Sequence, residues 1–237
     1  MTEAQPRILW TSNIVLPAAA EALGLTQTPF GGWLSLMTER LAATGRFQIG
    51  VAMRAEGVPF TRIETGGVIY YALPARRQDR FDVAQGDCEK VLADFAPDLL
   101  HVEGAEMRHA RRFLATWRGR KLLSMQGVLQ GYAQFELGQL PLLKMLSPLR
   151  PRIMATALTL MLNYWFRFRP RLEHERQSMA AATHVMGRTL WDRAQAQALA
   201  PQAAYTACNR ILRDTFYRTI WDQGSATPHS IFIGNGA

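Results

Sequence analysis

Short apolar runs alternate along the chain with longer runs that are apolar on one helical face. A strand is predicted over 7–15, in RILWTSNIV, and a helix over 32–45, ended by Gly45. A second strand is predicted over 47–55, and two short strands flank a Gly66-Gly67 turn. The later predicted helices are 82–97, 105–119, 189–200 and 209–222, and the later predicted strands are 98–104, 121–127, 183–188, 203–208 and 229–237.

This order predicts an α/β fold. Strand, loop and helix repeated in turn are typical of a Rossmann-like, doubly wound parallel sheet with helices on both faces. The pattern is interrupted over 128–179, where apolar and basic residues carry no strand signal, so we expect a helical insertion there. We expect one domain over 1–230. Residues 231–237 look like a strand that leads into a turn, so we expect them to begin a linker to a further domain.

The amino-acid composition excludes several classes of protein but does not identify a function. Of the 237 residues, 48% are hydrophobic and 19% are charged, which is typical of a globular chain, and the net charge of +8 favours polyanionic partners. Cys88 and Cys208 are too few for a disulfide framework or a zinc site, so a reducing cytoplasm is the default. The N-terminus has no signal-peptide pattern, and no stretch is long enough to span a bilayer.

The predicted insertion is basic at its ends and apolar at its centre. Residues 144–176 hold seven cations and two glutamates, a net charge of +5, and the 14 residues of 153–166 are uncharged. A buried helix with solvated arginines at its ends is the plainer interpretation. Contact with an anionic membrane surface is the alternative, whereas nucleic acid is disfavoured because no recognition motif accompanies the charge. The candidate membrane residues are Arg152, Trp165, Arg167, Arg169 and Arg171.

Three loops at predicted strand ends carry candidate chemistry. Gly31 and Gly32 precede a helix, where glycine lets backbone approach an anion, although a plain turn explains them equally well. His101 and Glu103 share one strand face, with Gly104 after them, and a lone histidine in a strand is often a core residue. Gln126 and Gly127 end another strand, where an amide could position a sugar hydroxyl. We find no catalytic triad and no metal-ligand spacing.

The order of these loops resembles a known family. The Gly-Gly loop, PDLLHVEG, LLSMQG, HVMGRTLWDRA, CNRILRDTFY and IFIGNGA are similar to the N-terminal, acceptor-side half of a GT-B glycosyltransferase of family 4. That family comprises retaining enzymes that use nucleotide sugars, many of them in bacterial polysaccharide and glycolipid synthesis. The resemblance implies a sugar transfer to a cell-envelope glycan or lipid-linked acceptor. It implies no cofactor and no metal.

The resemblance also assigns roles by position. Gly31 and Gly32 match the loop that approaches the donor diphosphate, and Arg188 is a further donor-side candidate. Gln126 stands where many members have histidine near the reacting sugar, so histidine-assisted steps at that position are in doubt. His101 is the second catalytic candidate. The acceptor-side candidates are Glu103, Gly104, Gly127 and Asn209.

The family's paired donor-site glutamates belong to a second domain, beyond the last residue of this sequence. We therefore expect this fragment to be inactive alone. We also expect it to be cytoplasmic, with peripheral contact to the inner face of the membrane as the accompanying expectation. A non-catalytic Rossmann-like module that binds anionic membranes or a partner is the alternative interpretation.

Overall fold

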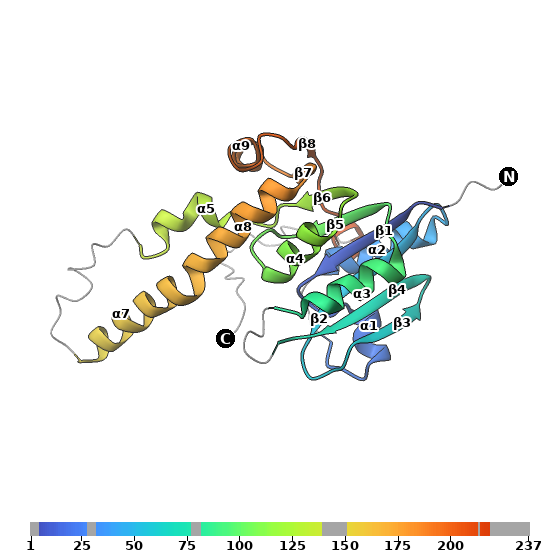
Figure 1. Cartoon of the computed structure of the whole chain (residues 1–237), viewed down its shortest axis with the longest axis horizontal. Helices are drawn as coiled ribbons and strands as arrows, with labels where there is room; N and C mark the ends of the chain where they lie inside the picture. Colours follow the sequence, from blue (N-terminus) through green and yellow to red (C-terminus); the bar gives the residue numbers. More distant parts are fainter. Residues whose placement is uncertain (1–4, 28–31, 77–81, 139–150, 213, 219–237) are drawn as a thin grey trace, which may run out of the picture.

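A single eight-stranded sheet forms the body of the molecule (Figure 1). The computed structural model describes residues 5–27, 32–76, 82–138, 151–212 and 214–218. The strand order is β3-β4-β2-β1-β5-β6-β7-β8, and every pairing is parallel except that of β3 with β4. The strands are β1 Arg7–Ser12, β2 Gln48–Ala55, β3 Thr61–Thr65, β4 Val68–Pro74, β5 Leu99–Glu103, β6 Arg120–Ser124, β7 His184–Gly187 and β8 Ala204–Ala207.

Helices cover both faces of this sheet, which confirms the predicted doubly wound α/β fold (Figure 1). One apolar core lies under α1 and α2, and a second lies under α3, α4, α8 and α9. The helices are α1 Pro17–Ala22, α2 Gly32–Ala43, α3 Gln85–Phe95, α4 Arg108–Thr116, α5 Leu129–Tyr132, α7 Pro151–Asn163, α8 Arg169–Ala181, α9 Leu190–Leu199 and α10 Asp214–Arg218, with a 3-10 turn at Ala133–Phe135 and a π-helix at Tyr164–Phe168.

The period-two alternation of each strand divides its side chains between the two cores. Trp10 packs in the core under α1 and α2, whereas its neighbour Leu9 packs in the core under α3 and α4. Gly50 of β2 faces the second core. A Cβ there would lie 2.7 Å from the Phe95 ring, so the close approach of α3 to the sheet requires glycine.

The prediction and the structure differ at two elements. The short helix α1 was not predicted, because Pro17–Ala22 is alanine-rich and too short to show an amphipathic period. The helix predicted over 209–222 is observed only as α10, and residues 209–212 are not helical. The last predicted strand, 229–237, lies outside the described residues.

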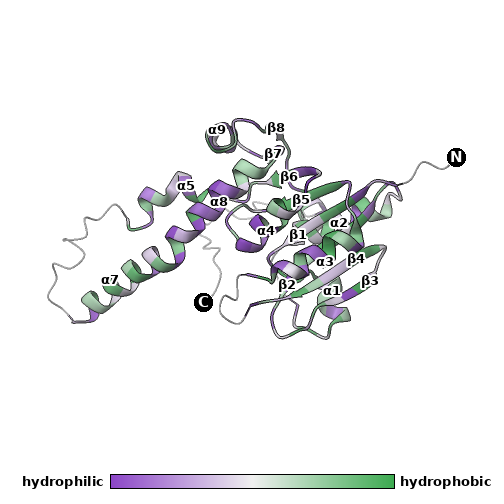
Figure 2. Cartoon of the chain, in the orientation of Figure 1, coloured by the Kyte–Doolittle hydropathy of each residue, from purple (hydrophilic) through white to green (hydrophobic). Residues whose placement is uncertain are grey.

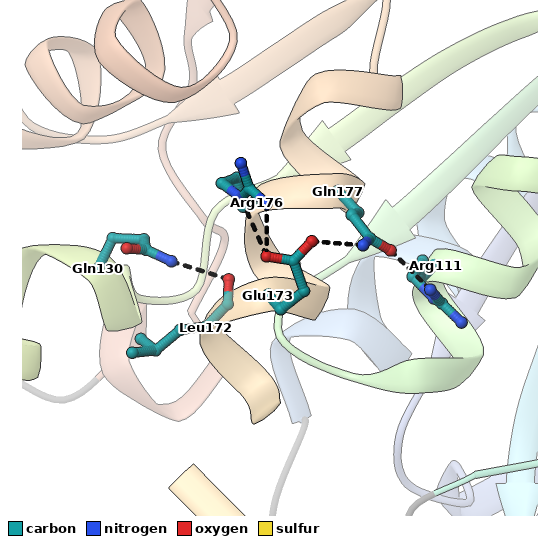
Figure 3. Close-up of polar contacts among 6 residues, drawn as sticks. All are labelled: Arg111, Gln130, Leu172, Glu173, Arg176 and Gln177. Atoms are coloured by element: carbon teal, nitrogen blue, oxygen red, sulfur yellow. Dashed lines mark hydrogen bonds and ion pairs between the residues drawn. The ribbon is translucent and has the colours of Figure 1, made fainter. Parts of the chain in front are cut away.

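A long helical arm projects from the body of the molecule (Figure 1). This arm consists of α7, the π-helix and α8 in unbroken succession over 151–181. Its α8 portion packs against α4 and α5. Gln130 Nε2 donates to the Leu172 carbonyl at 2.8 Å, and Arg111 donates to Gln177, which in turn donates to Glu173 (Figure 3). The base of the arm is therefore held to the sheet layer by polar contacts on two sides.

The α7 portion of the arm is apolar and exposed (Figure 2). The larger exposed side chains of α7 and of the π-helix that follows it include Ile153, Met154, Leu158, Leu160, Leu162, Trp165 and Phe166. Even so, none of the described helices is both long enough and apolar enough to cross a membrane.

Candidate functional site

The strand order reverses direction at β1. From β1 the chain first builds β2 and β4 on one side, then returns to place β5 on the other side. In open α/β sheets, ligands bind beyond the carboxyl ends of the strands at such a switch point. The carboxyl end of β5 is therefore where the topology favours a site.

Buried polar side chains occupy this end of the sheet. His101 and Glu103 alternate with apolar residues along β5, so both lie on the face covered by α1 and α2. His101 Nε2 lies 2.6 Å from Ser124 Oγ of β6 and 3.4 Å from Glu103 Oε1. The Trp10 ring contacts the His101 ring at a centroid distance of 4.9 Å. The prediction that His101 and Glu103 share one face is thus confirmed.

Arg210 completes the group from a distant part of the sequence. It follows β8, and its Nη2 donates to Glu103 Oε2 at 2.8 Å. The same guanidinium lies 3.7 Å from the centroid of the Trp33 ring, at the start of α2. The side chain of Glu103 is 1% exposed and that of Arg210 is 12% exposed, so this is a buried ion pair. We call His101, Glu103, Ser124, Arg210 and Trp33 the switch-point cluster.

Burial dominates the electrostatics of the cluster. It lowers the pKa of His101 to about 3, with a further lowering from the Arg210 charge, so the imidazole is neutral at physiological pH. It raises the pKa of Glu103, whereas Arg210 and hydrogen bonds involving Gln126 and Ser124 act in the opposite direction. A neutral histidine in this setting is suited to orienting its neighbours by hydrogen bonding.

Two buried polar atoms of the cluster have unused hydrogen-bonding capacity. Among the described residues, Arg210 Nη1 has no hydrogen-bond partner, and Glu103 Oε1 has no well-formed hydrogen bond beyond the 3.4 Å approach of His101 Nε2. Unpaired buried donors and acceptors are uncommon in folded proteins and are costly unless water or a ligand satisfies them. This is the behaviour of a site that meets a polar molecule.

The loop after β6 carries Gln126 and Gly127 to the edge of the cluster. Both residues are exposed, and the Gln126 carbonyl accepts a long hydrogen bond of 3.4 Å from Arg188 Nη2, in the loop after β7. Glu175 of α8 anchors this loop, because its carboxylate accepts the backbone N–H groups of Leu129 and Gln130, each at 2.8 Å. The structure thus brings Gln126 and Arg188 together beside Glu103.

The predicted glycines and Asn209 surround the same end of the sheet. Gly104 has a φ of +79° and its N–H donates to the Ser124 carbonyl at 2.9 Å, which fixes the turn after β5. Gly32 begins α2 and precedes Trp33, and Asn209 is exposed next to Arg210. Gly31 lies outside the described residues.

The predicted membrane residues lie apart from the cluster, on the arm. Arg152, Trp165, Arg167 and Arg169 are exposed, and the Arg169 guanidinium lies 4.4 Å from the Trp165 ring centroid. Arg171 differs from them because it faces the body, with its Nη2 at 3.9 Å from Glu106 Oε1.

Three members of the cluster were not predicted. Ser124 was within reach of the sequence, since it lies two residues before Gln126 in a predicted strand. Trp33 and Arg210 gave no such signal, because their contact depends on how the chain folds after β8. Across the described part of the chain, no three His, Cys, Asp or Glu side chains are grouped closely enough to hold a metal ion.

Comparisons with known proteins find similar structures but no similar sequences. No family model matches the sequence, and no curated protein matches it. A solved structure of sucrose-phosphate synthase from Thermosynechococcus elongatus matches with a TM-score of 0.52 at 12% identity, over 86% of this chain and 47% of the other. UGT73P12 from Glycyrrhiza uralensis, solved with glycyrrhetinic acid 3-O-monoglucuronide, matches with a TM-score of 0.42 at 8% identity, over 86% of this chain and 48% of the other.

The first of these likenesses shows a shared fold. The Rossmann-like α/β prediction is confirmed. This chain spans about half the length of both solved structures, and it has the fold of the matched half of the sucrose-phosphate synthase.

Proposed function

We propose that this chain is the acceptor-side half of a GT-B glycosyltransferase, of the retaining family-4 type. It would act with a second, donor-binding domain to move a sugar from a nucleotide sugar to a cell-envelope glycan or a lipid-linked acceptor. The observation that carries the proposal is the buried polar cluster at the switch point of a sheet whose fold matches half of a sucrose-phosphate synthase.

The proposed roles follow the positions of the side chains. Gly31 and Gly32 would supply backbone N–H groups to the donor diphosphate, and Gly32 is the first residue of α2. Arg188, which donates to the Gln126 carbonyl, would add a cation. Gln126 and the neutral His101 would orient the reacting groups by hydrogen bonding. The acceptor side would comprise Glu103, Gly104, Gly127 and Asn209. Leaving-group stabilisation of this kind uses cations and helix N-termini, so the proposal includes no metal and no cofactor.

The test is Gly32→Val in the full-length enzyme. A branched side chain would block backbone approach to the diphosphate, so we expect transfer to be abolished while the circular dichroism spectrum and thermal midpoint stay close to the wild type. Gly86→Val is the matched control, because Gly86 is also near the start of a helix, α3, and a Cβ there meets nothing within 4 Å. Unchanged turnover in Gly32→Val would contradict the role of Gly32 in binding the donor diphosphate.

The fold alone also admits a non-catalytic module that binds a membrane or a partner. A screen of the full-length protein for hydrolysis or transfer from several nucleotide sugars separates this alternative from the enzyme. Turnover of any of them supports the enzyme. A protein that binds vesicles and turns over none of the donors is the module.

We further propose that the arm contacts an anionic membrane surface. The specific observation is a stripe of exposed apolar side chains on α7 and the π-helix, namely Met154, Leu158, Leu162, Trp165 and Phe166. Met154, Leu158, Leu162 and Trp165 are spaced by three or four residues and so follow one side of the arm, and Phe166 is the residue next to Trp165. Exposed patches of this kind mark interaction sites.

Charge selects a membrane as the partner of this stripe. Arg169 lies over the Trp165 ring at the end of the stripe, so apolar and cationic groups are adjacent, as they are at the boundary between acyl chains and head groups. Since the described helices are too short or too polar to span a bilayer, the contact would be peripheral.

Co-sedimentation with vesicles tests this contact. We expect binding to vesicles that contain phosphatidylglycerol and little binding to phosphatidylcholine alone. Charge reversal at Arg167 and Arg169 should abolish it, whereas Arg193→Glu, an exposed site on α9, should not. Equal binding of the wild type to both vesicle types would count against the membrane proposal.

A further inference from the structure

Arg210 connects two parts of the site that the sheet does not connect. Glu103 ends β5, whereas Trp33 lies in the first turn of α2, on a helix that covers the sheet. The Arg210 guanidinium donates to the first at 2.8 Å and lies 3.7 Å from the ring centroid of the second. A planar guanidinium can do both at once, because it donates in its plane and stacks through its face.

Residues 209–212 are shaped by this contact. Their sequence favours a helix, yet helical structure is observed only from Asp214. The Arg210 side chain is largely buried between two other segments, and the residues on both sides of it form neither helix nor strand. The segment after β8 is therefore not helical at the position where its arginine meets Glu103 and Trp33.

We infer that Arg210 is a positioning residue: it fixes the first turn of α2, which begins at Gly32, against the acceptor-side carboxylate Glu103. The inference rests on the proposed function in so far as Gly32 binds the donor. Arg210 acts through Trp33 and Glu103. Its loss should therefore loosen α2 locally and misplace the two halves of the site.

The experiment uses three variants of the full-length protein: Arg210→Met, Glu103→Gln and the double variant. The single Arg210→Met leaves a buried carboxylate without its countercharge, so it is expected to lower the thermal midpoint strongly. The double variant removes both charges and should recover most of that loss. Any remaining defect then reports on positioning.

Hydrogen exchange at the amides of 36–39, which are the first to donate within α2, is the first measurement. We expect it to be at least tenfold faster in the double variant than in Glu103→Gln, which keeps the stacking of Arg210 on Trp33. Arg210→Lys should be intermediate, because lysine keeps the charge but loses the planar face. Arg193→Met is the control, since Arg193 is exposed on α9. Equal exchange in the double variant and in Glu103→Gln would overturn the inference.

Sugar transfer is the second measurement. We expect kcat/KM for the nucleotide sugar to fall at least tenfold from Glu103→Gln to the double variant, and a wild-type-like value there would overturn the positioning role. If the wild type transfers no sugar from any donor, the proposed function fails, and the exchange measurement alone still decides whether Arg210 holds α2.

Discussion

The end of the sheet and the arm distribute polar and apolar side chains in opposite ways. The switch-point cluster buries a carboxylate and a histidine, with Glu103 3% exposed and His101 4% exposed. The arm leaves large apolar side chains in solvent, with Phe166 75% exposed and Leu158 54% exposed. Both arrangements run against the usual preference of residues for interior or surface.

This contrast indicates which region's substitutions should change the free energy of unfolding. A buried charge is costly unless it is paired, so the cluster depends on each of its partners and should respond strongly to substitution. Exposed apolar side chains contribute little to folding, so the arm should tolerate substitution well and reveal its purpose only in the presence of a partner. Substitutions in the two regions should therefore differ in their effect on stability.

The largest effect is expected from acid. The folded-state pKa of His101 is lowered to about 3, below its ordinary value of 6.5, so the fold favours the neutral ring. Its contribution to stability is complete above pH 6.5 and is lost as the pH falls toward 3. The difference between these values corresponds to roughly 5 kcal/mol of unfolding free energy. Urea unfolding of the wild type and of His101→Gln, from pH 7 to pH 4, should show the part of this loss that falls above pH 4, about 3 kcal/mol.

The sign of this effect is specific to the histidine. Glu103 has a raised pKa, so its cost to stability is relieved as the pH falls, and it opposes the histidine. The free energy of unfolding of the wild type, relative to that of His101→Gln, should therefore fall on acidification. A gap that does not change with pH would show that His101 is not held neutral.

Much of the fold could be predicted from the sequence because its signals are local. Alternation placed His101 and Glu103 on one face of a strand, and the glycines at Gly45 and Gly66 marked real turns with positive φ. The parallel sheet with helices on both faces followed from the repeated strand and helix pattern, which leaves few topologies. These features depend on residues that are adjacent in the chain, so they can be predicted from the sequence directly.

The rest depends on contacts between distant residues. Arg210 meets Glu103 across 107 positions of sequence, and it lies in the part of the predicted helix over 209–222 that is not helical in the structure. The role of Glu175 was equally hidden, since a charged residue on a helix usually faces solvent, whereas here it holds the loop after β6. Of the five members of the switch-point cluster, the sequence singled out two, His101 and Glu103.

The second prediction concerns the buried ion pair. Replacing Glu103 by alanine leaves the Arg210 charge buried without a partner, so we expect a loss of about 3 to 4 kcal/mol in urea unfolding. Glu64→Ala is the control, because Glu64 on β3 pairs with Arg62 at 3.8 Å on the exposed surface, and it should cost under about 1 kcal/mol. Similar losses for both variants would contradict the distinction.

The third prediction concerns the joint between the two regions. Glu175 lies on the arm and accepts two backbone N–H groups of α5, and glutamine at this position can accept with only one oxygen. We expect Glu175→Gln to cost about 1 to 2 kcal/mol. Hydrogen exchange at Leu129 and Gln130 should also become faster. Glu21→Gln, at an exposed position on α1, should change neither quantity.

The smallest effect on stability is expected on the arm itself. Leu158→Gln with Leu162→Gln exchanges two exposed apolar side chains for polar ones, so the unfolding free energy should change by less than about 0.5 kcal/mol per site. Binding to phosphatidylglycerol vesicles should nevertheless be lost, because the apolar stripe is what would enter the lipid. A loss of stability with retained vesicle binding would mean that the stripe packs against protein, and the arm would then be an internal element of a larger molecule.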